Sequence, residues 1–379
     1  MRDARLVEVA FCLIASANVL FAQGVGQGQG EYSSLEANMG GATNASKKVP
    51  GEAVARQAVT VAQLTDAIET AKGKSDEDAV NEIEHLELTE RLSSPELARL
   101  SEELPGAGSK AALMAVGDAS VFLEPPQGEM LDKAAPDAAE QRQIVSRASD
   151  YLKTIIPKLP DLYARRITNV FEEEWTAQDK EGTHKPVPLN LKGKFHATVL
   201  YRNGKEVVHA EGAEQGGLIT LGTFGPVLTA VIIDNLRSPM QWPGWEQGPN
   251  GAIAVFQFQV PQKDSHYEVS FPTGGLPYAR RTGYHGEIGI DPDTGTILRL
   301  VVQSDPVFGS RAVDHGNIML EYGSVVLGGK AYTCPVHGVS MSTGSYWEGR
   351  HKTGAFILLA DVVFTDYHVF RSEIRILPN

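Results

Sequence analysis

The chain has 379 residues and a formal net charge of −13, with 42% hydrophobic and 21% charged residues. This composition is typical of a globular protein, and the length allows two or three domains with cores of their own. The negative charge argues against nucleic acid and anionic lipid headgroups as partners, because both attract basic surfaces.

Residues 1–22 have the pattern of a secretory signal peptide. Arg2 and Arg5 form a positive start, and the apolar run from Val9 to Ala22 is too short to span a bilayer. The alternative is a buried N-terminal helix. We predict a signal peptide cleaved at about residue 22, which places the mature chain in the periplasm or outside the cell. No later stretch has the length and hydropathy of a membrane-spanning helix, so we do not expect an integral membrane protein.

Residues 23–58 are rich in Gly, Gln, Asn, Ser and Ala and are predicted to form a flexible linker. The segment 59–123 that follows is predicted to be an acidic helical bundle. Between residues 60 and 105 there are twelve Asp and Glu against four Lys and Arg. Such a surface is either simply solvated or a docking surface for a basic partner.

Capping signals mark the starts of the short helices in this bundle. Thr60 with Gln63 makes a capping box, and Ser75 and Ser94 stand at the starts of the next two helices. A fourth helix is predicted over residues 111–122. Short connections between helices favour antiparallel packing.

Residues 124–160 are predicted to be a loop followed by a connecting helix. Ile144, Ala148 and Leu152 recur on one apolar stripe of this helix, and Pro157 ends it.

Residues 161–379 are predicted to form an antiparallel β-sheet domain, because apolar residues alternate and tight turns join the runs. Asn203-Gly204 is a hairpin signal, and the sequence DPDTG at 291–295 is a turn signal. The stretch 162–174 fits a helix or a strand. Late in the chain, strands are predicted at residues 317–322, 324–328, 331–341, 354–364 and 367–377.

One helix interrupts the sheet domain. Gly225 and Pro226 begin it, and its residues leave little polar face, so the helix must be buried on more than one side. The predicted fold class is α+β: a small N-terminal helical bundle, then a curved, half-barrel-like antiparallel β-sheet with an apolar helix on its concave face.

The segment 331–341 contains the pair Cys334 and His337 at C-x-x-H spacing. This pair is a metal site, a nucleophile with its base, or part of an ordinary strand. A regular strand separates the two side chains, whereas a bulge near Pro335 or Gly338 would bring them round. Zinc would require two further ligands, and after signal-peptide removal no second thiol is present. We predict a buried strand residue, with no metal, no cofactor and no catalytic residue.

The apolar helix and the sheet either fill each other or leave a cavity between them. A cavity would suit an acyl chain or another apolar ligand, which needs few polar groups. The side chains predicted to line it are Val231 and Ile232 of the helix and Phe256 and Phe258 of a strand.

Two segments carry a resemblance to known proteins: YHGEIGIDPDTGTILRLVVQ (284–303) and FTDYHVFRSEIRIL (364–377). They resemble a family of uncharacterised secreted bacterial proteins with a D-P-x-T-G turn and a closing Y-H/R-x-F-x-S-E strand. More loosely, residues 160–379 resemble the periplasmic lipoprotein-carrier fold of the LolA and RseB type. The resemblance implies a curved antiparallel sheet that binds lipid or lipoprotein acyl chains. It implies no particular site residues, and the carriers have no counterpart of the acidic helices.

The sequence therefore predicts a secreted, non-enzymatic binding or carrier protein for an apolar ligand. One alternative is an envelope scaffold that uses its acidic helical bundle as the contact surface for a protein partner. A further alternative is an unrecognised hydrolase, whose paired carboxylates would have to come from residues such as Asp291, Asp305 and Glu321. The serine-hydrolase motif G-x-S-x-G is absent from the sequence.

Overall fold

The computed structural model describes residues 56–176, 188–210, 223–235, 240–271, 278–306, 313–348 and 351–370. The predicted signal peptide (1–22) and almost all of the predicted linker (23–58) lie outside these residues. The export prediction is therefore not tested by the structure.

The described residues contain six α-helices and two short 3-10 helices. In chain order these are α3 (Val61–Ala71), α4 (Asp76–Ile83), α5 (Ser94–Glu102), α6 (Ala107–Ala119), η1 (Gln127–Glu129), α7 (Ala138–Ile155), η2 (Ile156–Lys158) and α8 (Pro226–Asn235).

Eleven strands form one large antiparallel sheet that is not closed, in the order β3-β7-β8-β11-β12-β13-β14-β15-β4-β5-β6. This confirms the mixed class of helices with a large antiparallel sheet. The bounds of these strands are β3 (Met130–Leu131), β4 (Leu162–Thr176), β5 (Asn190–Arg202), β6 (Lys205–Ala210), β7 (Gln241–Gly248), β8 (Gly251–Val260), β11 (Tyr284–Ile290), β12 (Ile297–Ser304), β13 (Val313–Leu327), β14 (Lys330–Glu348) and β15 (His351–Val369).

Two short strand pairs lie apart from the large sheet. Strands β9 (Glu268–Phe271) and β10 (Tyr278–Arg281) form an antiparallel pair. Strands β1 (Gln57–Val59) and β2 (Leu86–Leu88) pair in parallel beside the first helices. Sequence reasoning did not foresee this parallel pair, because each strand has only three residues and lies between helical segments.

Local capping chemistry explains where the helices begin. The predicted capping box of Thr60 and Gln63 is present at α3, and Ser75 accepts a hydrogen bond from the Asp78 backbone at α4. Helix α5 begins one residue earlier than predicted, with Ser93 in the capping position. Helix α6 begins four residues before the predicted Ala111, because Gly106 is an extended N-cap that a count of apolar residues overlooks.

The strands of the sheet are longer than the sequence pattern suggested. The ambiguous stretch 162–174 lies in strand β4, where each residue from 162 to 172 has a partner on strand β5 or on strand β15. The predicted strands 317–322 and 324–328 fall in the single strand β13. The predicted strand 354–364 and the start of the one at 367–377 fall in the single strand β15, and residues 371–377 lie outside the described residues. The predicted breaks lie at irregularities inside continuous strands: the register of β13 on β14 shifts between Glu321 and Tyr322, and that of β15 on β4 shifts between Thr365 and His368.

Both predicted turns are confirmed. Asn203 and Gly204 have positive φ angles of 51° and 74°, as the hairpin between β5 and β6 requires. At the β11–β12 turn, Asp291 accepts a backbone hydrogen bond from Gly295, whose φ is +76°. A Cβ on Gly295 would lie 2.5 Å from the Arg147 backbone of α7, so this turn also needs glycine for close packing.

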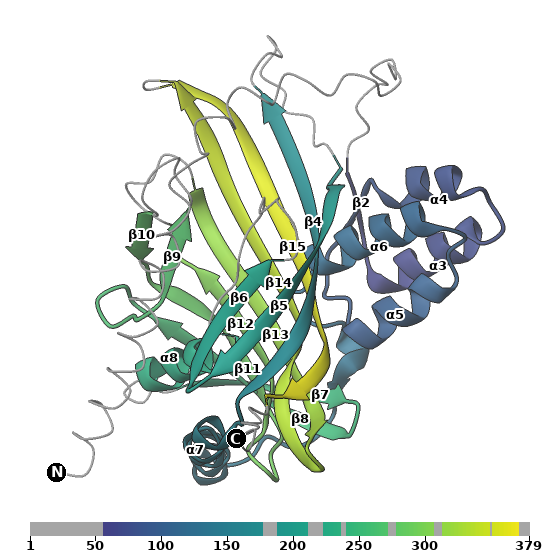
Figure 1. Ribbon diagram of the computed structural model, residues 1–379. Coiled ribbons are helices and arrows are strands. Elements are labelled where there is room, and N and C mark those ends of the chain that lie inside the picture. Colours follow the sequence, from purple (N-terminus) through teal and green to yellow (C-terminus); the bar gives the residue numbers. More distant parts are fainter. Residues whose placement is uncertain are drawn as a thin grey trace, which may run out of the picture.

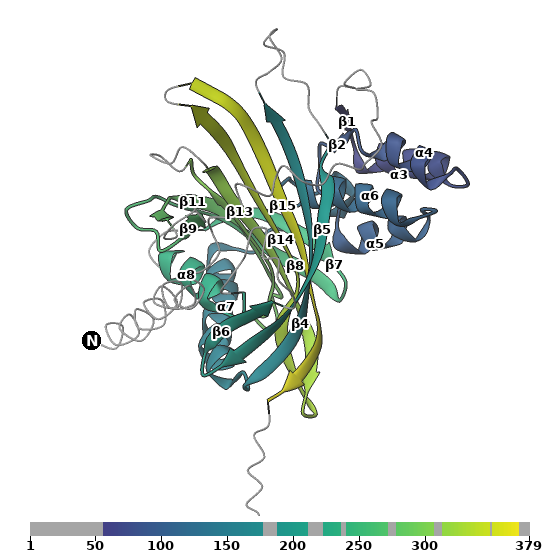
Figure 2. The same cartoon turned by 45° about the horizontal axis from the view of Figure 1, so that its top comes forward.

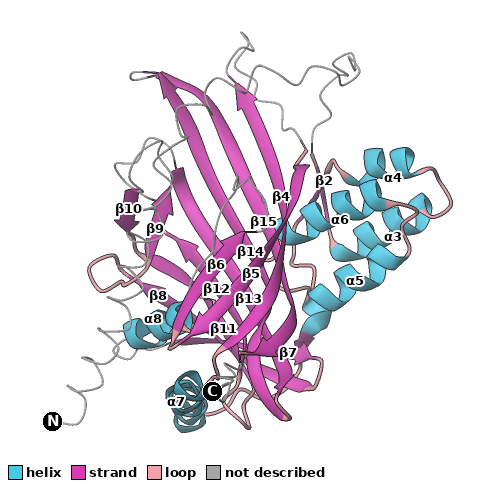
Figure 3. Cartoon of the chain, viewed as in Figure 1, coloured by secondary structure: helices cyan, strands magenta, loops and turns pink. Residues whose placement is uncertain are grey.

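The two faces of the sheet carry different helices (Figures 1, 2 and 3). Leu300 and Leu320 belong to a buried cluster with residues of α7 and α8, whereas their neighbours Val301 and Met319 pack against α6. This alternation follows from the period of two along a strand. The sheet is therefore buried on both faces where these helices cover it.

A buried quartet of charges joins the helical segment to the sheet. Arg91, which follows β2, donates hydrogen bonds of 2.7 Å to Glu287 of β11 and 2.6 Å to Glu246 of β7. Arg299 of β12 donates to both glutamates, at 2.7 Å to Glu287 and 2.9 Å to the nearer oxygen of Glu246. Two positive and two negative groups balance, so the cluster tolerates burial.

Candidate functional site

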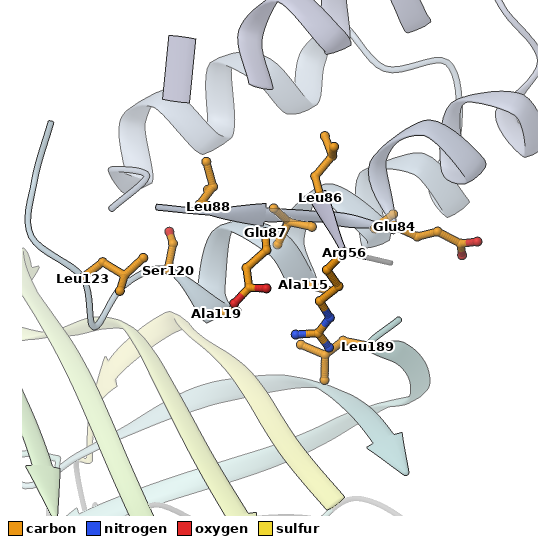
Figure 4. A pocket seen from close by; sticks show the side chains of 12 residues that line it. Arg56, Glu84, Leu86, Glu87, Leu88, Ala115, Ala119, Ser120, Leu123 and Leu189 are labelled. Atoms are coloured by element: carbon orange, nitrogen blue, oxygen red, sulfur yellow. The ribbon is translucent and has the colours of Figure 1, made fainter. Parts of the chain in front are cut away.

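The helical segment and the sheet leave a cleft between them, with a volume of about 130 Å³ (Figure 4). The residues that line it come from β2, α6 and the segments flanking β1, β2, α6 and β5. They are Arg56, Glu84, Leu86, Glu87, Leu88, Ala112, Ala115, Val116, Ala119, Ser120, Leu123 and Leu189.

The cleft has apolar walls because of the residues that its elements present. Helix α6 contributes Ala112, Ala115 and Ala119, whose short side chains leave space beside the helix. Leu123, with an exposed fraction of 37%, and the half-buried Leu189 lie at the cleft as well. An apolar ligand in the cleft would cover these two side chains.

Charged groups also reach the cleft. Figure 4 shows the side chain of Arg56 beside Leu189, with Glu87 facing the same space. Arg56 forms an ion pair with Glu173 of strand β4. The cleft thus combines apolar walls with charged groups, which is the arrangement of sites that hold an apolar ligand with a polar end.

The four residues predicted to line a ligand cavity are brought together in one buried cluster. Val231 and Ile232 of α8 and Phe256 and Phe258 of β8 belong to one cluster, with exposed fractions of 1%, 7%, 1% and 4%. Side chains of α7 pack against the same cluster. Neither the cleft nor a much smaller cavity of about 10 Å³ is lined by any of the four.

Helix α8 is held at its end by a polar contact. Asp234 accepts hydrogen bonds from the Tyr284 hydroxyl at 2.7 Å and from the His266 backbone at 2.9 Å, and it also contacts the His266 ring. Burial and the adjacent Asp234 carboxylate raise the pKa of Tyr284 well above its ordinary value. Tyr284 therefore stays a neutral donor that fixes the helix to strand β11.

Cys334 behaves as a small buried hydrophobe. Its side chain is fully buried in a cluster with Leu162, Tyr201, Phe224 and Phe364. Burial raises the pKa of this thiol to about 12, so it is protonated near neutral pH. This is the ordinary strand residue that the sequence favoured.

His337 is engaged by carboxylates rather than by Cys334. Its Nε2 lies 2.9 Å from Asp361 of β15, and its Nδ1 lies 3.2 Å from Glu321 of β13. The predicted bulge is present, since Glu321 pairs with His337 while the next residue of β13 pairs with Pro335. The bulge does not bring His337 to the thiol, so the Cys–His pair does not form.

The charge of His337 is set by opposing effects. Burial alone would lower the pKa of the ring, but hydrogen bonds to Asp361 and Glu321 raise it well above its ordinary value. Asp118 of α6 also lies in this cluster. Sequence reasoning missed the cluster, because its members come from four separate elements and no motif joins them.

Acidic residues of the turn and helices have structural partners. Asp291 accepts backbone hydrogen bonds from Asp293 and Thr294, which is the role that a turn asks of it. In the helical segment, Asp76 accepts hydrogen bonds from Gly108 and Ser109 at the start of α6. Much of the acidic character noted in the sequence thus serves internal contacts.

Comparison with protein-family models, with curated proteins and with solved structures finds no match to this chain. The resemblance to the lipoprotein-carrier fold therefore stays a prediction. Among the described residues, no helix is both long and apolar enough to cross a membrane.

Proposed function

We propose that the protein is an exported, non-enzymatic binding or carrier protein for an apolar ligand such as a lipid acyl chain. The observation that carries the proposal is the apolar cleft between the helical segment and the sheet. The half-barrel-like curvature of the sheet, with apolar helix α8 on its concave face, accords with such a role. The sequence pattern of residues 1–22 supports export.

The size of the cleft limits what it can hold. Its volume of about 130 Å³ is close to the roughly 150 Å³ of an engineered apolar cavity that binds benzene. The cleft therefore accepts one short apolar group, such as the end of an acyl chain. Each methylene buried there contributes about 0.8 kcal/mol, so a few methylenes give weak, reversible binding, as a carrier needs.

The position of the site differs from the one first predicted. Val231, Ile232, Phe256 and Phe258 are packed together, so a ligand could enter between them only if α8 moved away from the sheet. The cleft at α6 needs no such movement. We therefore place the proposed ligand at α6 rather than at α8.

A fluorescent fatty acid titrated into the purified chain tests this function. Ala119→Phe fills the cleft and is expected to weaken binding at least tenfold. Ala98→Phe, on an exposed position of α5, is the matched control and should bind as the original chain does. Equal binding by the Ala119→Phe variant would contradict the site.

Two further measurements test the function itself. Native mass spectrometry of protein purified gently from its cell envelope should show a bound lipid. Phe258→Ala removes a side chain from the α8 core and should leave fatty-acid binding unchanged. Absence of any lipid, together with no fatty-acid binding by the original chain, would refute a carrier function.

A further inference from the structure

A second site lies where helix α6 meets the sheet, and it does not depend on the proposed ligand. Asp118 of α6, His337 of β14 and Asp361 of β15 each present a ligand atom, and these three atoms lie within 4.8 Å of one another. The three elements reach this point from a helix and two adjacent strands, so the cluster bridges the two parts of the molecule.

Asp118 is buried without a hydrogen-bond partner among the described residues, and the only compensation that the cluster offers it is the nearby ring of His337. Its side chain is fully buried, and neither carboxylate oxygen has a hydrogen-bond partner among the described residues. A buried carboxylate without partners is strongly destabilising, because its hydration is lost and nothing replaces it. In this cluster a second carboxylate, Asp361, lies beside it, and repulsion adds to the cost.

Hydrogen bonds from neighbouring residues orient the side chains of His337 and Asp361, as the residues around a bound metal ion orient its ligands. Glu321 contacts Nδ1 of His337, which leaves Nε2 directed toward Asp361. Ser94 lies near both Glu321 and His337, donating to the carboxylate at 2.8 Å. Asn169 donates a hydrogen bond of 2.8 Å to the other oxygen of Asp361. A carboxylate on the far nitrogen of a histidine is the common outer shell of a metal ligand.

We propose that Asp118, His337 and Asp361 bind a divalent transition-metal ion that fastens helix α6 to the sheet. One imidazole nitrogen and two carboxylate oxygens suit zinc or manganese, and they lack the all-oxygen character that calcium prefers. A cation at this point gives one oxygen of Asp118 a partner and offsets the charges of Asp118 and Asp361. Its role is structural, because the ligands are almost fully buried.

The geometry requires a small contraction to close around the ion. Ligand atoms about 2.1 Å from zinc in a tetrahedral shell lie about 3.4 Å from one another. The present limit of 4.8 Å therefore has to shorten by about 1.4 Å, whereas Nε2 of His337 and the nearer oxygen of Asp361, now 2.9 Å apart, would separate by about 0.5 Å. The three protein ligands leave one position for a water molecule or another oxygen.

The test uses the full chain without an affinity tag, purified with and without a chelator. Elemental analysis should find about one equivalent of zinc or manganese in protein that has not met the chelator. Zinc added to chelated protein should raise its melting temperature, whereas calcium and magnesium should not. Absence of both the bound metal and the zinc-dependent shift would overturn the proposal.

Two substitutions separate metal binding from ordinary packing. Asp118→Asn keeps the shape, so the metal-free variant should melt at or above the original chain, while its zinc affinity falls at least tenfold. Glu321→Gln should weaken zinc binding about ten- to a hundredfold, since it removes the outer contact to His337. Asp150→Asn, on an exposed side chain of α7, is the control and should not change zinc binding. An unchanged zinc affinity in Asp118→Asn would overturn the proposal.

Discussion

Arg91 offers a direct test of how the helical segment is joined to the sheet. Replacing it with methionine keeps the length of the side chain but removes the cation between Glu246 and Glu287. Arg299 would then face two buried carboxylates alone, with one negative charge left unbalanced. Breaking a buried ion cluster in this way costs about 3–5 kcal/mol, so Arg91→Met should lose stability of that order.

Arg99 is a matched control in the same part of the chain. It also bonds to two glutamates, Glu96 at 2.5 Å and Glu103 at 2.7 Å, distances close to those of Arg91. The difference is exposure, because the Arg99 side chain is 48% exposed and the Arg91 side chain only 5%. Water screens the exposed pairs, and Arg99→Met should cost at most about 1 kcal/mol.

The measurement is urea unfolding followed by tryptophan fluorescence, with hydrogen exchange to locate the loss. Exchange in the Arg91→Met variant should rise first in α3 to α6, since that segment loses its charged attachment. The double variant Arg91→Met with Glu287→Gln restores charge balance and should be more stable than the sum of the single changes predicts. If the losses in free energy of unfolding caused by Arg91→Met and Arg99→Met differ by less than about 0.5 kcal/mol, burial does not strengthen the contribution of this cluster to stability.

Two other predictions concern single positions. Because burial raises the pKa of Cys334 to about 12, peptide mapping should find this thiol unlabelled by iodoacetamide in native protein near neutral pH and labelled after unfolding; labelling of the native protein at the rate of a free thiol would contradict its burial. Gly286→Ala places a Cβ 2.0 Å from the Val301 backbone oxygen and should lower stability by at least 1–3 kcal/mol, whereas Gly128→Ala meets no atom within 4 Å and should be neutral in the same thermal melt.

Local signals in the sequence predicted local structure well. Thr60 with Gln63, Asn203 with Gly204 and the turn at 291–295 all form as expected, because each depends on backbone geometry within a few residues. The helix of residues 138–155 was predicted from its apolar stripe for the same reason.

Contacts between distant segments could not be predicted in this way. Nothing near Arg91 in the sequence shows that it meets Glu246 and Glu287, and nothing near His337 shows that Asp118 lies beside it. The sequence left open whether the apolar helix and the sheet fill each other or enclose a cavity, and the side chains of Val231 and Phe256 lie in one buried cluster. Periodicity shows which residues are buried, but it does not show whether the space between two apolar surfaces is filled.

The order of strands has a consequence for when the sheet can form. Strand β4 follows soon after α7 and η2, yet it pairs with β15, the last strand of the sheet in the chain; Val170, for example, lies opposite Ala360. Strands β4, β5 and β6 can therefore join the part of the sheet that contains β7 to β14 only after β15, near the end of the chain, has been synthesised. Pairing between strands so far apart in the sequence slows folding. Until β15 is present, the edges of β4 and β14 have no partner strand and can pair with other chains. A chain cut short before β15 would lose one strand, but its sheet would separate into two parts.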